Sequence, residues 1–302
     1  MKFGFAVPAY GAHADGPAIR DLLEAGDELG FETAWFPDHI AVPDYAAAVN
    51  LSPPFLEPLA TCAWGLGLTK RLRVGTDVLV APYRHPLLVA AMTGTLGRLA
   101  GDRLILAVGI GYLKGEFEVL GTAPYERRAE ITEEFLRAQR SAPDGYSVVS
   151  PPTPVPLWVG GNAPAALRRA ALLGDGWHPL WIPDRTYAEA RQRILETRAA
   201  AGLTGPFTFS YSCGPTRLLT RSQESWSPPP PRLPRESEFR YAPEAWVGDD
   251  DRPRFMGTAD QLVADFRLLE AAGVDHVTLR FGSTEVGDLE RFVTQVRSAF
   301  DP

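Results

Sequence analysis

Short apolar segments alternate with amphipathic helical segments along almost the whole chain, and this alternation restricts the possible folds more than any other feature. Eight segments fit β-strands, and nearly all of them are followed by apolar residues at helical spacing. Strands that alternate with helices predict a parallel sheet. The predicted strands are residues 3–8, 32–36, 72–80, 104–108, 157–159, 176–180, 207–213 and 277–281, and the predicted helices are residues 18–29, 58–68, 85–99, 125–140, 163–173, 185–201, 261–272 and 289–300.

The number of strand–helix units favours a closed barrel over an open sheet. Eight units in about 250 residues, plus one insertion, match a (β/α)8 TIM barrel. An open doubly wound sheet normally has a G-x-G-x-x-G turn after its first strand. The first strand here ends at Pro8, Ala9, Tyr10 and Gly11 instead. We therefore predict an α/β protein with a single barrel domain over residues 1–302.

Residues 221–254 interrupt the alternation. This segment is rich in proline and charge, and it lies between the seventh strand and its helix. It is either a surface loop or a lid, since barrel active sites lie at the carboxyl-terminal face from which it emerges.

Charge and cysteine content exclude several classes of partner. The net charge is −7 with the signs interspersed, so neither nucleic acid nor an anionic membrane is an expected partner. The two cysteines, Cys62 and Cys213, lie far apart and have no metal-type spacing, so no metal site or disulfide framework is predicted. Neither a signal peptide pattern nor a run of ~18 apolar residues occurs. We expect a cytoplasmic protein.

Polar residues stand at the predicted carboxyl ends of two strands, where a barrel places its catalytic groups. Asp38 and His39 directly follow the second strand. Histidine can move a proton near neutral pH, and a neighbouring carboxylate can tune it, although the pair could equally cap a loop. Asp77 interrupts the third strand beside Val78, which indicates either a bulge at a functional site or a tolerant strand edge.

Glycines follow two later strands. Gly109 and Gly111 end the fourth strand, where they either approach a ligand or simply turn the chain. Gly160 and Gly161 follow the fifth strand, with Asn162 as the expected N-cap of the next helix. The free N–H groups of such a helix start favour a phosphate, although an ordinary turn has the same pattern.

Two further histidines lie near strand ends. His85 follows the third strand and His178 ends the sixth, and each is more often structural than catalytic. Metalloprotease, P-loop and serine-hydrolase motifs are missing from the sequence, as are clustered cysteines and histidines.

Taken together and in order, the motifs resemble the luciferase-like monooxygenase superfamily, and within it the coenzyme F420-dependent oxidoreductases. The resemblance extends over nearly the whole chain. It depends on Trp35-Phe36-Pro37-Asp38-His39, Val74-Gly75-Thr76-Asp77-Val78, Gly109-Ile110-Gly111-Tyr112 with Gly115-Glu116-Phe117, Val159-Gly160-Gly161-Asn162 with Gly174-Asp175-Gly176-Trp177, and Phe255-Met256-Gly257-Thr258 with Gly273-Val274-Asp275-His276.

The resemblance implies a flavin-type ring at the carboxyl-terminal mouth of the barrel, above a non-proline cis peptide at Asp77–Val78. It also implies roles for the residues around that ring. Asp38 and His39 would be catalytic, with Asp38 supporting His39. The cofactor would contact Asp77, Val78, Gly109, Ile110, Gly111, Tyr112, Gly160, Gly161 and Asn162, and the substrate pocket would be lined by Trp35, His85, Trp177 and His178.

Three functions remain open from the sequence. The first is an F420-dependent oxidoreductase that moves a hydride between the deazaflavin and a small organic substrate. The second is an FMN-dependent monooxygenase that uses reduced flavin and dioxygen, and the third is a non-catalytic binding subunit on the same fold. By the same resemblance we expect a homodimer, with the helices near the second and third strands at its interface.

Overall fold

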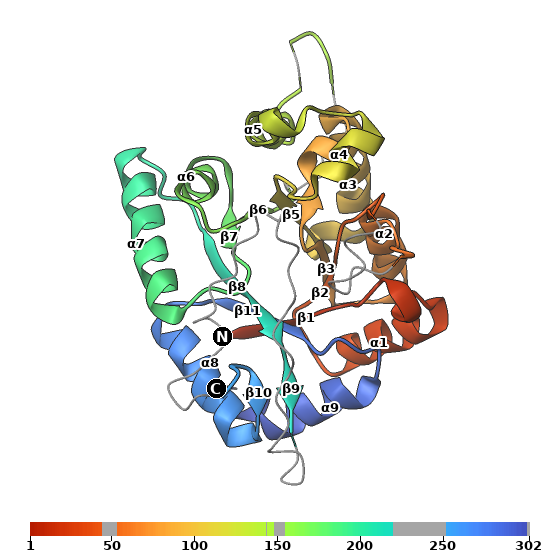
Figure 1. The fold of residues 1–302 in the computed structure, drawn as a ribbon, viewed down its shortest axis with the longest axis vertical. Helices are drawn as coiled ribbons and strands as arrows, with labels where there is room; N and C mark the ends of the chain where they lie inside the picture. Colours follow the sequence, from red (N-terminus) through yellow and green to blue (C-terminus); the bar gives the residue numbers. More distant parts are fainter. Residues whose placement is uncertain (44–52, 143, 148–154, 220–251, 301–302) are drawn as a thin grey trace.

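The structure is a computed structural model that describes residues 1–43, 53–142, 144–147, 155–219 and 252–300. Within these residues, parallel strands close into a barrel that helices surround (Figure 1). The strands are β1 (Lys2–Ala6), β2 (Thr33–Phe36), a third strand in two pieces, β3 (Arg73–Thr76) and β4 (Leu79–Val80), then β5 (Leu104–Gly109), β6 (Leu157–Gly160), β7 (Gly176–His178), β8 (Thr208–Pro215) and β11 (His276–Arg280). Their order is β3-β2-β1-β11-β8-β7-β6-β5, and pairing of β3 with β5 closes the circle. The predicted eight-stranded barrel is confirmed.

The helices follow the strands in the expected alternation. They are α1 (Gly16–Glu28), α2 (Pro58–Leu68), α3 (Pro86–Ala100), α4 (Lys114–Leu120), α5 (Arg128–Ala138), α6 (Pro164–Leu173), α7 (Asp184–Ala200), α8 (Ala259–Ala271) and α9 (Val286–Gln295). The short helix α4 was not predicted from the sequence. None of the helices in the described part of the chain has both the length and the apolar character needed to cross a membrane.

Local sequence explains where several helices begin and end. The Asp15 carboxylate caps α1 by accepting a hydrogen bond from Ala18 N at 3.0 Å, and Gly30 follows the helix with a φ of 75°. The α8 helix begins with a capping box between Thr258 and Gln261. These signals are local in sequence, which is why the helix positions could be predicted from it.

A small second sheet lies beyond the barrel strands. Its strands, β9 (Arg217–Leu218) and β10 (Met256–Gly257), pair in parallel and bring together the two ends of the predicted 221–254 insertion. Residues 221–251 of that insertion lie outside the described residues, so its expected role as a loop or lid stays a prediction.

Strand alternation separates an outer core from the barrel interior. Phe3 and Phe5 of β1 point outward into the layer between strands and helices. Inside the barrel, Trp35 packs with Trp158, and its ring stacks on His178 with centroids 4.7 Å apart. His276 lies edge-on to Trp35 at 5.7 Å, so the barrel interior contains both aromatic and polar groups.

Candidate functional site

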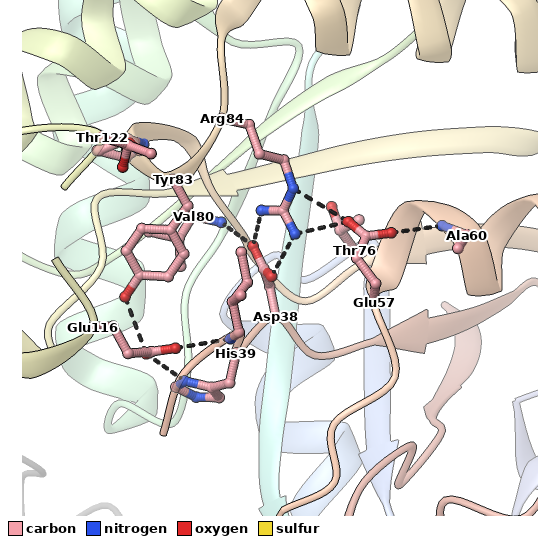
Figure 2. Close-up of polar contacts among 12 residues, drawn as sticks. Asp38, His39, Glu57, Ala60, Thr76, Val80, Tyr83, Arg84, Glu116 and Thr122 are labelled. Atoms are coloured by element: carbon pink, nitrogen blue, oxygen red, sulfur yellow. Dashed lines mark hydrogen bonds and ion pairs between the residues drawn. The ribbon is translucent and has the colours of Figure 1, made fainter. Parts of the chain in front are cut away.

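A network of polar side chains assembles where β2, β4 and β5 end. Figure 2 shows His39 facing Glu116 on one side, and Arg84 lying between Asp38 and Glu57 on the other. These residues come from three strand–helix units, because the carboxyl ends of parallel strands meet at the same end of a barrel.

Glu116 on α4 is the hydrogen-bond partner of His39. The His39 Nδ1 atom lies 2.8 Å from Glu116 Oε2, and Tyr83 donates its hydroxyl to the same oxygen at 3.0 Å. The other oxygen, Oε1, accepts the backbone N–H groups of Ile40 and Ala41 at 2.8 and 3.1 Å. One buried carboxylate therefore holds both the His39 ring and the loop that follows it.

The charge on Glu116 determines the tautomer of His39. Burial acts to raise the pKa of Glu116, but the hydrogen bonds from His39, Ile40 and Ala41 outweigh it, and the pKa lies below its usual range. An ionised carboxylate can only accept hydrogen bonds, so Nδ1 of His39 carries a proton. In the neutral ring Nε2 then has a lone pair, and it faces the Tyr112 hydroxyl at 3.5 Å.

Asp38 belongs to a separate ion pair. Its two oxygens accept Arg84 NH1 and NH2 at 2.6 and 2.8 Å, and Oδ2 also accepts Val80 N at 2.8 Å. Arg84 binds Glu57 as well, at 2.7 Å. Burial raises the pKa of the Asp38 carboxyl, and the Arg84 guanidinium opposes that shift. The prediction that Asp38 supports His39 is therefore corrected, because the carboxylate that contacts the imidazole is Glu116.

The third strand is interrupted by a cis peptide between Asp77 and Val78, as the resemblance implied. The side chain of Val78 occupies the space beside two glycines. A Cβ atom added at Gly109 would lie 2.5 Å from Val78 Cγ2, and one at Gly160 would lie 3.1 Å from Val78 Cγ1. Glycine at these positions is explained by the packing of Val78, whether or not a cofactor approaches them.

Asp77 joins two sides of the barrel interior. Its Oδ1 lies 3.0 Å from His178 Nε2, and Oδ2 accepts Arg280 NH2. Arg280 also donates to the Ser212 hydroxyl at 3.0 Å, while His178 Nδ1 lies 2.7 Å from Ser210 Oγ. These hydrogen bonds connect β3, β7, β8 and β11 at the mouth of the barrel.

The pKa of Asp77 predicts a loss of stability in acid. Burial alone would raise this pKa, but the charge of Arg280 and the hydrogen bond from His178 hold it at about 2, below the ordinary 3.8. A depressed folded-state pKa gives stability that is present above about pH 4 and lost as the pH falls towards 2, worth about 2 kcal/mol. We expect Asp77→Asn to be less stable than the unmodified protein in urea at pH 7, with a smaller difference at pH 2.5. An equal difference at both pH values would contradict this assignment.

The predicted phosphate site differs from expectation in one residue. Ala163, rather than Asn162, is the N-cap of α6, and no side chain caps this helix within the described residues. Asn162 instead donates its amide to Leu180 O at 3.1 Å. Gly161 has a φ of 101°, which turns the chain out of β6, and it is exposed together with Asn162 and Ala163. The helix start therefore remains open to an anion.

The four predicted pocket residues differ in burial and in the direction of their side chains. Trp177 is fully buried on the outer side of β7, where it stacks on Tyr187 of α7. Trp177 and His178 are consecutive residues of β7, so their side chains point to opposite sides of the strand, and His178 points inward. The expectation that both line one pocket is therefore wrong. Trp35 is also fully buried in the barrel interior. His85 is the exposed N-cap of α3, and its Nδ1 accepts Leu87 N at 3.3 Å.

Five members of the polar networks were not expected from the sequence: Glu116, Arg84, Glu57, Tyr83 and Arg280. One sequence signal could have indicated Glu116. It is an acidic residue that lies between the glycines ending the fourth strand and the apolar residues of a short helix. Nothing in the sequence indicates which group Arg84 or Arg280 would bind, because their partners lie 46 and 203 residues away.

Comparison with known proteins gives consistent matches. The model of the luciferase-like monooxygenase family matches residues 1–224. An uncharacterized protein of Mycobacterium tuberculosis is 32% identical over 68% of this chain and 79% of its own length. An F420-dependent glucose-6-phosphate dehydrogenase of Beutenbergia cavernae is 31% identical over 72% of this chain and 68% of that protein. The structure of an F420-dependent secondary alcohol dehydrogenase, in complex with an F420-acetone adduct, superposes with a TM-score of 0.77 at 18% identity, covering 99% of both chains.

Proposed function

The chain belongs to the luciferase-like monooxygenase family, and from this premise we propose that it is an F420-dependent oxidoreductase acting on a small organic substrate. The observation that carries the proposal is the His39–Glu116 pair at the barrel mouth. The similarity to an F420-dependent dehydrogenase at 31% identity supports the same cofactor. A deazaflavin accepts or gives a hydride when bound, and the protein supplies position and proton transfer.

The residues at the mouth fit a planar ring with a phosphate-bearing tail. Val78 is partly exposed, and its methyl groups lie against Gly109 and Gly160, which gives an apolar surface for one face of a ring. The uncapped, exposed start of α6 suits the phosphate. In our proposal Val78 and the backbone from Gly109 to Tyr112 support the ring, and Gly161 and the α6 start hold the phosphate.

His39 is the proposed proton carrier. With Nδ1–H donated to Glu116, Nε2 is the atom that can take a proton from a substrate hydroxyl, or return one to a carbonyl oxygen. The Glu116 carboxylate orients the ring and stabilises the imidazolium that forms after proton uptake. Glu116 is therefore a positioning residue rather than a group that touches the substrate.

The first test is a fluorescence titration of the purified apo-protein with oxidised F420 and, separately, with FMN. We expect tight binding of F420 and weak binding of FMN. The reverse preference would move the protein to the FMN-dependent monooxygenases. Binding of neither cofactor by the folded protein would favour the non-catalytic subunit.

A matched pair of variants tests where the phosphate binds. Ala165 and Ala188 are both exposed, near the starts of α6 and α7 respectively. Ala165→Glu is expected to weaken cofactor binding about tenfold, since it adds a negative charge near the phosphate. Ala188→Glu adds the same charge to the next helix and is expected to leave the dissociation constant unchanged. Equal effects of the two variants would contradict the proposed position.

We also propose a homodimer formed through α2 and α3, which pack against each other. Apolar side chains are exposed along both helices, and those on α3 fall on one face at spacings of four and seven residues. They are Trp64, Leu88, Met92 and Leu99. Light scattering is expected to give twice the 33.0 kDa chain mass, and Leu88→Asp is expected to give a monomer. Val119→Asp, at an exposed apolar residue on α4, is the control. A monomeric unmodified protein would contradict the proposal.

A further inference from the structure

Polar atoms without protein partners gather inside the barrel, beneath the network at its mouth. They belong to four side chains on β2 and β11, each no more than 2% exposed, and none has a hydrogen-bond partner among the described residues. The atoms are Thr33 Oγ1, Trp35 Nε1, Thr278 Oγ1 and both ring nitrogens of His276. Buried polar groups are nearly always hydrogen-bonded, so a cluster of unpaired ones requires an explanation.

The strand register brings these atoms around Gly4. Gly4 lies on β1 between Thr33 of β2 and Thr278 of β11, and it is paired directly with both. Thr33 shares its side of β2 with Trp35, and Thr278 shares its side of β11 with His276, so all four side chains face the barrel interior.

Two of the four side chains, Trp35 and His276, lie directly against Gly4. A Cβ atom at Gly4 would lie 3.0 Å from Trp35 Nε1 and 3.1 Å from His276 Cε1, the carbon between the two ring nitrogens. It would also lie 2.5 Å from the Thr33 carbonyl oxygen. Because residue 4 has no side chain, the Trp35 indole N–H and the His276 ring can lie close to its Cα.

The donor set determines what kind of ligand can satisfy these atoms. Trp35 Nε1 can only donate, so the ligand must accept a hydrogen bond. Burial, with the nearby charges of His178, Arg73 and Lys2, lowers the pKa of His276, so the ring is neutral and presents one donor and one acceptor. The ligand must therefore also donate, which excludes a metal cation and a simple anion. Water both donates and accepts.

We propose that Gly4, Thr33, Trp35, His276 and Thr278 form an internal water site in the barrel core. At least one water molecule there accepts a hydrogen bond from Trp35 Nε1 and forms hydrogen bonds with the two threonine hydroxyls and the His276 ring. The site is connected to the barrel mouth, because Trp35 stacks on His178 and His178 bonds Asp77 beside the cis peptide. The inference does not depend on which reaction the protein catalyses.

The sign of a stability change tests the proposal. Thr33→Val and Thr278→Val keep the side-chain shape and replace each hydroxyl by a methyl group. If water occupies the site, each variant removes one of its partners, and we expect the melting temperature to fall by about 1–5 °C. If the site is dry, each variant removes an unsatisfied polar group, and the melting temperature stays the same or rises.

Thr76→Val is the control that shows how far the melting temperature falls when a satisfied, buried threonine hydroxyl is removed. Thr76 is equally buried, and its hydroxyl already donates to Ala107 O at 2.7 Å, so this variant is expected to lower the melting temperature in either case. A fall for Thr76→Val with no fall for Thr33→Val and Thr278→Val would overturn the proposal.

A direct measurement covers the case in which a variant fails to fold. In a crystal structure of the unmodified protein at high resolution, we expect a water oxygen within 3.2 Å of Trp35 Nε1, the ordinary limit for such a hydrogen bond. Empty density around Gly4 would overturn the water site.

Discussion

Replacing His39 with asparagine is expected to lower kcat about 10²- to 10⁴-fold, the usual contribution of a positioned acid–base group. Asparagine keeps a polar group of similar size but cannot carry a proton. The dissociation constant of the cofactor should change little, because His39 meets the proposed cofactor support only at the Tyr112 side chain, whereas the proposed contacts there are backbone atoms, Val78 and the α6 start. The measurement is steady-state turnover of the F420-loaded enzyme, paired with the fluorescence titration of each variant.

Two variants of α4 separate the role of Glu116 from a general effect of charge. Glu116→Gln removes the anion that holds the Nδ1 proton, so the ring can adopt the other tautomer, and kcat should fall at least about tenfold. Glu118→Gln makes the same change on the exposed face of the same helix and should have no effect. The Glu116→Gln variant should also shift the pH profile of kcat, which a purely structural role would not do. If His39→Asn retains more than half of the unmodified kcat, His39 is not the proton carrier.

Replacing Arg84 with methionine is expected to lower the free energy of unfolding by about 3–5 kcal/mol, the usual cost of removing one partner of a buried ion pair. The Asp38 carboxylate is fully buried, and Arg84 supplies two of the three hydrogen bonds it accepts. Removal of the guanidinium leaves that carboxylate with only the Val80 N–H. It also releases Glu57, which caps α2. Urea unfolding at pH 7 is the measurement.

An exposed arginine provides the control for this prediction. Arg20 pairs with Asp21 at 2.8 Å on the surface of α1, where solvent screens the charges and the pair contributes little to stability. Arg20→Met should therefore leave the urea unfolding midpoint almost unchanged. In the double variant Asp38→Asn/Arg84→Met, much of the loss should be recovered, because no buried charge remains unpaired. A loss below 1 kcal/mol for Arg84→Met alone would show that the pair does not hold the loop after β2.

The sequence was sufficient for the barrel and for the position of its mouth. Hydrophobic periodicity is a local property, so the eight strands and most helices could be identified within a few residues. Hydrophobic periodicity did not reveal α4, because the seven residues of this helix are too few to show a helical period. Local sequence also predicts Asp38 and His39 at the carboxyl end of the second strand, and Asp77 and Val78 at an interruption of the third.

Side-chain partners and directions were predicted less well. Asp38 was assigned to His39 because the two residues are adjacent in sequence, yet adjacent residues at a strand end point to different sides. The resemblance implies that Trp177 and His178 line one pocket, yet they are consecutive in β7 and Trp177 faces α7 instead. Gly109 and Gly160 were interpreted as cofactor contacts, whereas the structure shows that both first make space for Val78.

What the sequence by itself determined is the order and type of the elements, and therefore the barrel and the end of it that carries the polar residues. Only the tertiary structure decided that Glu116 orients His39 across 77 residues, that Arg84 neutralises Asp38, and that Asp77 connects His178 to Arg280. The physical reason is that strand and helix formation depends on neighbours in the chain. Pairing of buried charges depends instead on which strand ends meet when the barrel closes.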